Sequence, residues 1–137
     1  MHILSMQPKQ DKAVNKKIVY IAHPINGDVE GNIKKILTIC KKVHSQKIIP
    51  FAHYVVANQY LDDGIKEERM LGIAAGNEFL KRGFIDELWL CGPKISAGMR
   101  EEIKLCLKNK IPIKCFNKGL QSEFEKILRE IRSKSVE

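Results

Sequence analysis

Residues 85 to 103 read IDELWLCGPKISAGMREEI, and this stretch predicts a strand, a tight loop and the start of a helix. Its apolar run from Leu88 to Cys91 is short and unbroken, as is typical of a strand buried on both faces of a parallel sheet. A glycine and a proline end that strand, and the Ser96 hydroxyl is placed to cap the next helix. Open α/β sheets bind anions and small ligands where a helix begins at the carboxyl edge of a strand, so we expect the functional site here.

Two glutamates, Glu101 and Glu102, follow the predicted cap. We expect them in the first turn of the helix, where a negative charge complements the positive end of the helix dipole. Gly98 adds backbone freedom in the same turn.

Apolar patterns on either side of this stretch predict the remaining elements. Short strands are predicted over Lys17 to Ala22, Lys47 to Phe51 and Ile111 to Phe116. Helical spacing predicts helices over about residues 29 to 46 and 66 to 82, a third over about 97 to 109, a C-terminal helix through Phe124 and Ile131, and a short helix near Val55. This order predicts an α/β fold, a single doubly wound, Rossmann/flavodoxin-like three-layer sandwich with a four- to five-stranded parallel sheet.

Length and composition favour one intracellular domain. With 137 residues, of which 44% are hydrophobic, we expect a flexible basic arm over residues 1 to 15 and a single domain over residues 16 to 137. The four cysteines stand singly in apolar segments, which favours buried thiols in a reduced cytoplasm and argues against a metal site or disulfides. No segment reaches the ~18 apolar residues of a membrane span. We therefore expect a cytoplasmic protein with no membrane partner, no metal and no cofactor.

The formal charge of +8 raises the question of nucleic-acid binding. Much of this charge comes from lysines on predicted helix faces and chain ends, and the few aromatic residues do not alternate with them as a base-stacking surface requires. The sequence therefore argues against a nucleic-acid partner. A positive field would equally attract a small phosphorylated substrate.

With these elements placed, the chain resembles the nucleoside 2-deoxyribosyltransferase superfamily, which includes nucleoside 5′-monophosphate N-glycosidases. The resemblance covers about residues 17 to 116 and is closest to a bacterial and phage branch. It rests on Val19 to Pro24, Pro50 with His53, Leu61 to Asp63 with Glu68-Arg69 and Leu71-Gly72, Asp86 to Trp89, and Ser96 to Met99 followed by Glu102.

The resemblance implies cleavage of an N-glycosidic bond by a covalent route. Glu102, six residues after Ser96, matches the glutamate that attacks C1′ in this superfamily, and Tyr20 matches a tyrosine that borders the nucleophile. Glu78 stands where a second carboxylate, usually Asp, transfers the proton, and Asp86 is the alternative. Two carboxyl groups across a sugar can act as nucleophile and acid/base, as in retaining glycosidases.

The same resemblance implies a pocket for a nucleoside or nucleotide. The Ser96 side chain, Gly98 and the Met99 backbone N–H match groups that hold a 5′-hydroxyl or 5′-phosphate. The loops after the first two strands would supply the pocket wall, through His23, Pro24, Asn26 and His53. Asn26 stands where the monophosphate-specific branch has a basic residue, so a phosphate preference stays open.

The residues themselves allow plainer interpretations. Glu78 lies near the edge of a predicted apolar stripe, where partial burial favours proton exchange near neutral pH, but it could instead pair with Lys81, Arg82 or Arg69. Glu102 could be an ordinary helix-dipole glutamate and Ser96 a plain cap. A nucleotide-binding module without turnover, or an adaptor with a basic surface, are therefore the alternatives to an enzyme.

Residues 52 to 72 carry more apolar and aromatic side chains than one thin sandwich can cover. Tyr54, Val56, Tyr60 and Leu71 are mixed there with a polar run. We therefore expect a homodimer or larger homo-oligomer with this segment at the contact, as the related enzymes complete each pocket with a neighbouring subunit.

Overall fold

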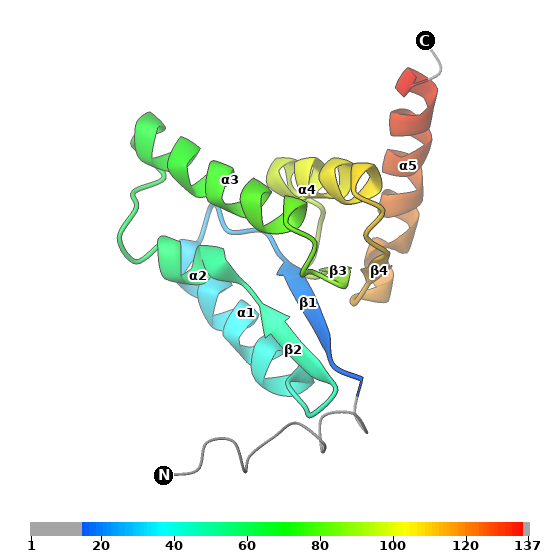
Figure 1. The fold of residues 1–137 in the computed structure, drawn as a ribbon. Coiled ribbons are helices and arrows are strands. Elements are labelled where there is room, and N and C mark those ends of the chain that lie inside the picture. The colour runs from blue at the N-terminus through cyan, green and yellow to red at the C-terminus, as the bar shows by residue number, and fades with distance from the viewer. Residues whose placement is uncertain (1–14, 136–137) are drawn as a thin grey trace.

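Four parallel strands form a single sheet in the order β2-β1-β3-β4 in the computed structural model, which describes residues 15–135. Most of the predicted basic arm, residues 1–14, lies outside the described residues. The elements are β1 (Lys17–Ala22), α1 (Val29–Val43), β2 (Ile48–Phe51), α2 (His53–Ala57), α3 (Lys66–Lys81), β3 (Glu87–Leu90), α4 (Ala97–Lys108), β4 (Ile113–Cys115), a 3-10 turn η3 (Lys118–Leu120) and α5 (Gln121–Ser135) (Figure 1).

The strand order places a topological switch between β1 and β3. The chain leaves β1 for β2 on one side and later returns to β3 on the other, and Val19 stands opposite Glu87 in the parallel register. In such sheets the crevice at the carboxyl ends of the two central strands is the usual place for a ligand. The predicted α/β three-layer fold is confirmed, with four strands in its sheet.

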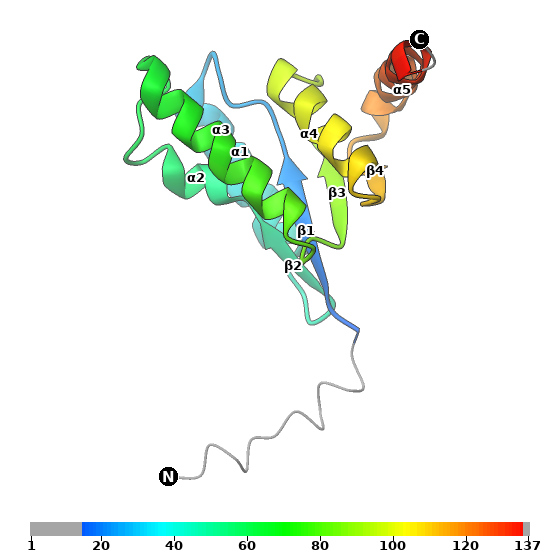
Figure 2. The same cartoon turned by 45° about the horizontal axis from the view of Figure 1, so that its top comes forward.

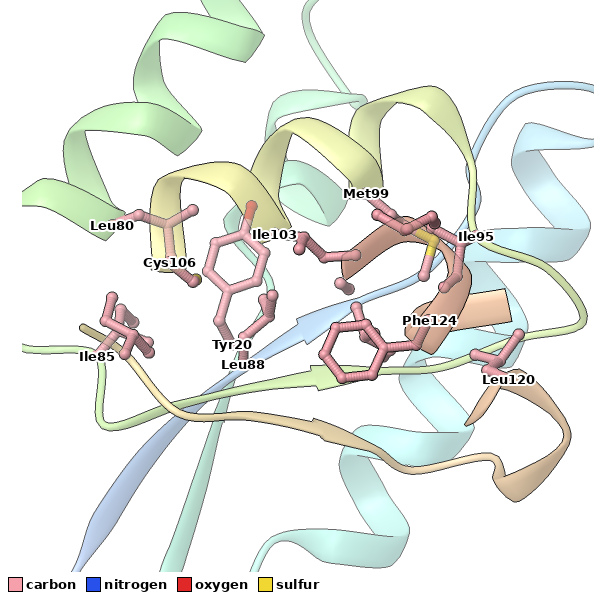
Figure 3. Packing of buried hydrophobic residues seen from close by; sticks show 14 residues of the cluster. Tyr20, Leu80, Ile85, Leu88, Ile95, Met99, Ile103, Cys106, Leu120 and Phe124 are labelled. Atoms are coloured by element: carbon pink, nitrogen blue, oxygen red, sulfur yellow. The ribbon is translucent and has the colours of Figure 1, made fainter. Parts of the chain in front are cut away.

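Helices cover the two faces of the sheet unequally. One face carries the larger core, to which α3, α4 and α5 contribute side chains such as Leu80, Ile103 and Phe124 (Figures 2 and 3). The other face packs Val19, Ile21 and Cys91 against Ile36 of α1. Both β1 and β3 are thus buried from both sides, which explains their nearly unbroken apolar runs.

Two predicted caps begin their helices as expected. The Asp28 side chain accepts a hydrogen bond from the Gly31 N–H at 3.0 Å at the start of α1, and Ser96 accepts one from the Met99 N–H at 3.2 Å at the start of α4. The placement of Glu101 and Glu102 in the first turn is wrong. Because α4 begins at Ala97, they are its fifth and sixth residues and lie in the second turn, away from the dipole's positive end.

The four cysteines are free thiols, of which Cys91 and Cys106 are buried and Cys40 and Cys115 are partly buried. Burial raises the pKa of the Cys91 and Cys106 thiols to about 12, so these two side chains act as small apolar groups of the core. Among the described residues, no helix combines the length and apolar character needed to cross a membrane.

Candidate active site

A hydrogen-bonded pair of side chains connects the sheet to α4. Tyr20 is buried in the middle of β1 and points toward α4 (Figure 3). Its hydroxyl donates a hydrogen bond of 2.7 Å to Oε2 of Glu102. The pair therefore lies on the face of the sheet that α3, α4 and α5 cover.

Burial changes the protonation of both members of this pair. It raises the pKa of Glu102 to about 7, although the hydrogen bond from Tyr20 acts in the opposite direction. The pKa of Tyr20 is raised well above its usual value, first by burial and then by the charge of Glu102, so the hydroxyl keeps its proton and acts as donor. Glu102 can consequently exist as acid or carboxylate near neutral pH, as is common in active sites.

Tyr54 of α2 closes the site on one side. Its hydroxyl donates a hydrogen bond to the Ile21 carbonyl of β1, and its ring centroid lies 6.2 Å from that of Tyr20. The pKa of Tyr54 is raised mainly by burial and next by the charge of Glu102, as expected for a phenol close to that carboxylate. The short helix α2 is thus tied to β1 beside the Tyr20–Glu102 pair.

Helix α3 approaches the same pair through a glycine. A Cβ atom placed on Gly76 would lie 3.4 Å from the Tyr20 hydroxyl oxygen, with no other heavy atom of the surroundings within 4 Å. The backbone of α3 therefore borders the pair without a side chain in between.

The loops after β1 and β3 meet at the switch point. His23 is buried, and its Nδ1 donates a hydrogen bond of 2.7 Å to the Pro24 carbonyl. Gly92 follows β3 with φ +98°, and a Cβ there would lie only 2.8 Å from Cδ of Pro24. Only glycine fits this contact, which explains the abrupt end of the strand.

The other predicted wall residues differ in exposure. Asn26 is exposed, and its carbonyl accepts a hydrogen bond of 3.4 Å from the Asn32 side chain. His53 begins α2, is partly buried and packs its ring edge against Phe79 of α3 at a centroid distance of 4.8 Å. His53 therefore lies between α2 and α3, whereas Asn26 faces solvent in the loop before α1.

The prediction that Glu78 is partly desolvated is wrong. Its side chain is 54% exposed and forms a 2.9 Å ion pair with Arg82 on the outer side of α3. Glu78 follows Gly76 by two residues, which turns it by about 200° around the helix and away from Tyr20. The sequence pattern failed because α3 buries only Leu80 completely, so its apolar stripe does not indicate a buried side.

Asp86, the alternative acid/base residue, is held at the amino edge of the sheet. One of its carboxylate oxygens accepts a hydrogen bond of 2.8 Å from the Ile18 N–H, and its own N–H donates to the Ile18 carbonyl at 2.8 Å. The carboxylate thus completes the pairing of β1 with the start of β3. The structure does not bring Asp86 or Glu78 to Glu102, whose pKa is raised by burial against the opposing effect of the Tyr20 hydrogen bond.

The predicted phosphate-binding groups lie at the start of α4, but the Met99 N–H already has a hydrogen-bond partner within the protein. The Met99 N–H donates to the Ser96 hydroxyl, the Ser96 N–H contacts the Met99 sulfur at 3.4 Å, and the Met99 side chain is buried in the core. Gly98 is exposed in the first turn. Ser96 and Met99 therefore cap the helix, whereas Gly98 lies at the protein surface.

Fold and site together define a class of protein: a doubly wound α/β domain in which a buried tyrosine of the sheet holds a partly buried carboxylate of the helix after β3. The chain belongs to the family described as a domain of unknown function (DUF7768), whose model matches residues 17–116. This match runs from the first residue of β1 to the residue after β4. Comparison with curated proteins and with solved structures gave no match.

Sequence reasoning missed two residues of this site, Tyr54 and Gly76. Tyr54 was expected at a subunit contact, but it is the second residue of α2 and its hydroxyl reaches back to the Ile21 carbonyl of β1. Gly76 left a clearer signal, because a glycine inside a helix is unfavourable and calls for a reason. Within residues 15–135, no three His, Cys, Asp or Glu side chains gather in a way that could hold a metal ion.

Proposed function

We propose that this protein cleaves the N-glycosidic bond of a nucleoside or nucleoside 5′-monophosphate, with Glu102 as the nucleophile. The observation that carries this proposal is the 2.7 Å hydrogen bond from Tyr20 to the partly buried Glu102 carboxylate, whose pKa burial raises to about 7. A nucleophilic carboxylate needs to be held in one orientation and kept poorly solvated, and the pair meets both needs.

The reaction follows the two steps of a retaining glycosidase. The Glu102 carboxylate forms a bond to C1′ while the bond from C1′ to the base nitrogen breaks, and the base leaves with that electron pair and takes up a proton from the solvent. Water, or a second base, then attacks C1′, the bond from C1′ to the carboxylate breaks, and the attacking group gives up its proton to the solvent. The Tyr20 hydroxyl donates to one carboxylate oxygen, which leaves the other oxygen for C1′.

Incubation with a panel of nucleosides and nucleoside 5′-monophosphates, followed by chromatography of the free base, tests this proposal. Release of a base that depends on Glu102 supports it. If no member of the panel loses its base, the protein is not an N-glycosidase for these substrates.

A nucleotide-binding module without turnover is the second candidate. The observation that favours it is the placement of Glu78 on the outer side of α3 and of Asp86 at the amino edge, which leaves neither next to Glu102. Thermal stabilisation by nucleotides without base release would support this alternative.

The positions of these two carboxylates lead to a prediction that reverses the sequence-based expectation. Glu78→Gln and Asp86→Asn are expected to change the rate of base release less than about twofold, since neither group acts on Glu102. Asp86→Asn should also destabilise the protein by about 1 kcal/mol, because it weakens the hydrogen bond to the Ile18 N–H. Initial rates and urea unfolding measure both effects. A tenfold or larger loss of rate in either variant would return that residue to the acid/base role.

We also propose that the working unit is a homodimer that covers the surface of α2 and the first half of α3. This surface carries six apolar side chains that are between 43% and 64% exposed. They are Val56, Tyr60, Ile65, Met70, Leu71 and Ile73. Several exposed apolar side chains on neighbouring elements are common at protein interfaces, and a second copy of the chain would offer the same side chains in return.

Leu71→Glu is expected to convert the dimer into a monomer, because it places a charge among these exposed apolar side chains, where Leu71 is 61% exposed. Light scattering at micromolar concentration should give twice the 15.7 kDa chain mass for the wild type and the single mass for the variant. Leu37→Glu is the matched control, since Leu37 is 52% exposed on α1 and should leave the dimer intact. A wild-type monomer that still turns over substrate would contradict the proposal.

A further inference from the structure

Gly76 borders the Tyr20–Glu102 pair in a way that the packing of the protein does not require. Gly92, in contrast, is needed where it stands, because its φ is +98° and a Cβ there would lie 2.8 Å from Cδ of Pro24. A Cβ on Gly76 would make one contact of 3.4 Å, to the Tyr20 hydroxyl oxygen, which is at the short end of ordinary van der Waals distances. Alanine would therefore fit the folded protein at position 76.

Glycine is a costly choice at this place in a helix. Position 76 lies in the interior of α3, where glycine loses more backbone freedom on folding than alanine and is less favourable. Neither backbone conformation nor neighbouring side chains explain the residue. The remaining explanation for the glycine is the space that it leaves next to the Tyr20 hydroxyl, the group that orients Glu102.

We propose that Gly76 controls access to this site: the space left by its missing side chain admits the substrate ring to Glu102. The inference rests on the proposed glycosidic cleavage and names a feature of the same site. A nucleophile and its target carbon must approach to about 3 to 3.5 Å, and a displacement of about 1 Å can cost a hundredfold in rate. A methyl group beside the Tyr20 hydroxyl would displace the sugar from Glu102 by about 1 Å.

Gly76→Ala tests this inference, with Gly72→Ala as the matched control. Gly72 lies one turn earlier in α3, and a Cβ there would meet Leu61 at 3.7 Å instead of the pair. Both variants should raise the melting temperature by about 2 to 5 °C, because both remove a helical glycine. Gly76→Ala should lower kcat/KM for base release by about tenfold or more, while Gly72→Ala stays within about twofold of the wild type.

The pH profile separates obstruction from a displaced tyrosine. If the methyl group only occupies substrate space, the limb of the kcat/KM profile that belongs to Glu102 stays at the same pH in both variants. A shifted limb in Gly76→Ala would mean that Tyr20 had moved, and it would overturn the inference. A lower melting temperature for Gly76→Ala would overturn it too, because packing would then require the glycine.

Failure of this inference can be distinguished from failure of the proposed function. If the wild type releases base and Gly76→Ala does so equally well, only the role of Gly76 is wrong. If the wild type binds nucleotides without releasing base, the same comparison is made on the thermal shift, and an equal shift in both variants overturns the inference. If the panel neither shifts nor reacts, the proposed function fails and the role of Gly76 fails with it.

Discussion

Replacing Glu102 by glutamine is expected to lower base release by about a thousandfold or more and, above pH 7, to make the protein more stable. The amide keeps the shape of the side chain and can still accept the hydrogen bond from Tyr20, but it cannot form the bond to C1′. A thousandfold loss corresponds to about 4 kcal/mol of transition-state stabilisation. Initial rates with the best substrate of the panel measure the loss.

The gain in stability follows from the direction of the pKa shift. Burial raises the pKa of Glu102 to about 7 from an ordinary value of 4.5. Between these two pH values the native state holds a proton that the unfolded chain has lost, so the free energy of unfolding falls as the pH rises and levels off above about 7. Glutamine has no charge to desolvate. We expect Glu102→Gln to be more stable than the wild type by about 2 kcal/mol at pH 8 and nearly equal to it at pH 4.

Glu101→Gln is the matched control for both measurements. Glu101 precedes Glu102 in α4, but its side chain is 65% exposed and pairs with Lys104 at 3.0 Å. It should change neither the rate nor the pH dependence of stability. Undiminished base release by Glu102→Gln would remove this residue from the nucleophilic role. A loss of stability at pH 8 would mean that the carboxylate serves the fold and not the site.

The strands and the helix caps could be predicted because each depends on a short stretch of sequence. The run from Leu88 to Cys91 indicated a strand buried on both faces, and the side chains of Asp28 and Ser96 each cap the helix that follows. These features require only local hydrogen bonds and burial.

The geometry of the site could be predicted only in part, because it depends on how helices are turned against the sheet. Tyr20 and Glu102 were paired by the family resemblance, and their contact spans 82 residues of sequence. For α3 the apolar pattern was too weak to fix its rotation, so it did not show that Gly76 faces Tyr20 while Glu78 faces solvent. The expectation that Asp86 could act as acid or base failed for another reason. Its carboxylate accepts a hydrogen bond from the backbone N–H of Ile18 in the neighbouring strand.

A second glutamate, Glu87, is expected to make the opposite contribution to stability. It is 4% exposed at the start of β3, where it accepts hydrogen bonds from Lys17 at 2.7 Å and from the Trp89 indole at 2.8 Å and pairs with Lys114 at 3.1 Å. Burial alone would raise the pKa of Glu87, but these partners outweigh it and lower the pKa to about 2. The carboxylate therefore stabilises the native sheet.

Glu87→Gln should destabilise the protein by about 2 kcal/mol at pH 7, because it removes the charge between two lysines. In the wild type the native state binds fewer protons than the unfolded chain between pH 2 and 4.5, so this contribution is present above pH 4.5 and is lost as the pH falls. In the variant, the free energy of unfolding should lack this decrease between pH 4.5 and pH 2. Urea unfolding at pH 3 and pH 7, followed by the fluorescence of Trp89, the single tryptophan, measures both effects.

Glu30→Gln is the control for this second experiment, since Glu30 pairs with Lys34 on the exposed face of α1, where its side chain is 86% exposed. Exposed pairs of this kind contribute little, so the control should unfold like the wild type at both pH values. If Glu87→Gln also unfolds like the wild type at pH 7, desolvation of the carboxylate offsets its three partners. In that case the acid-side loss of stability in the wild type must come from other carboxylates.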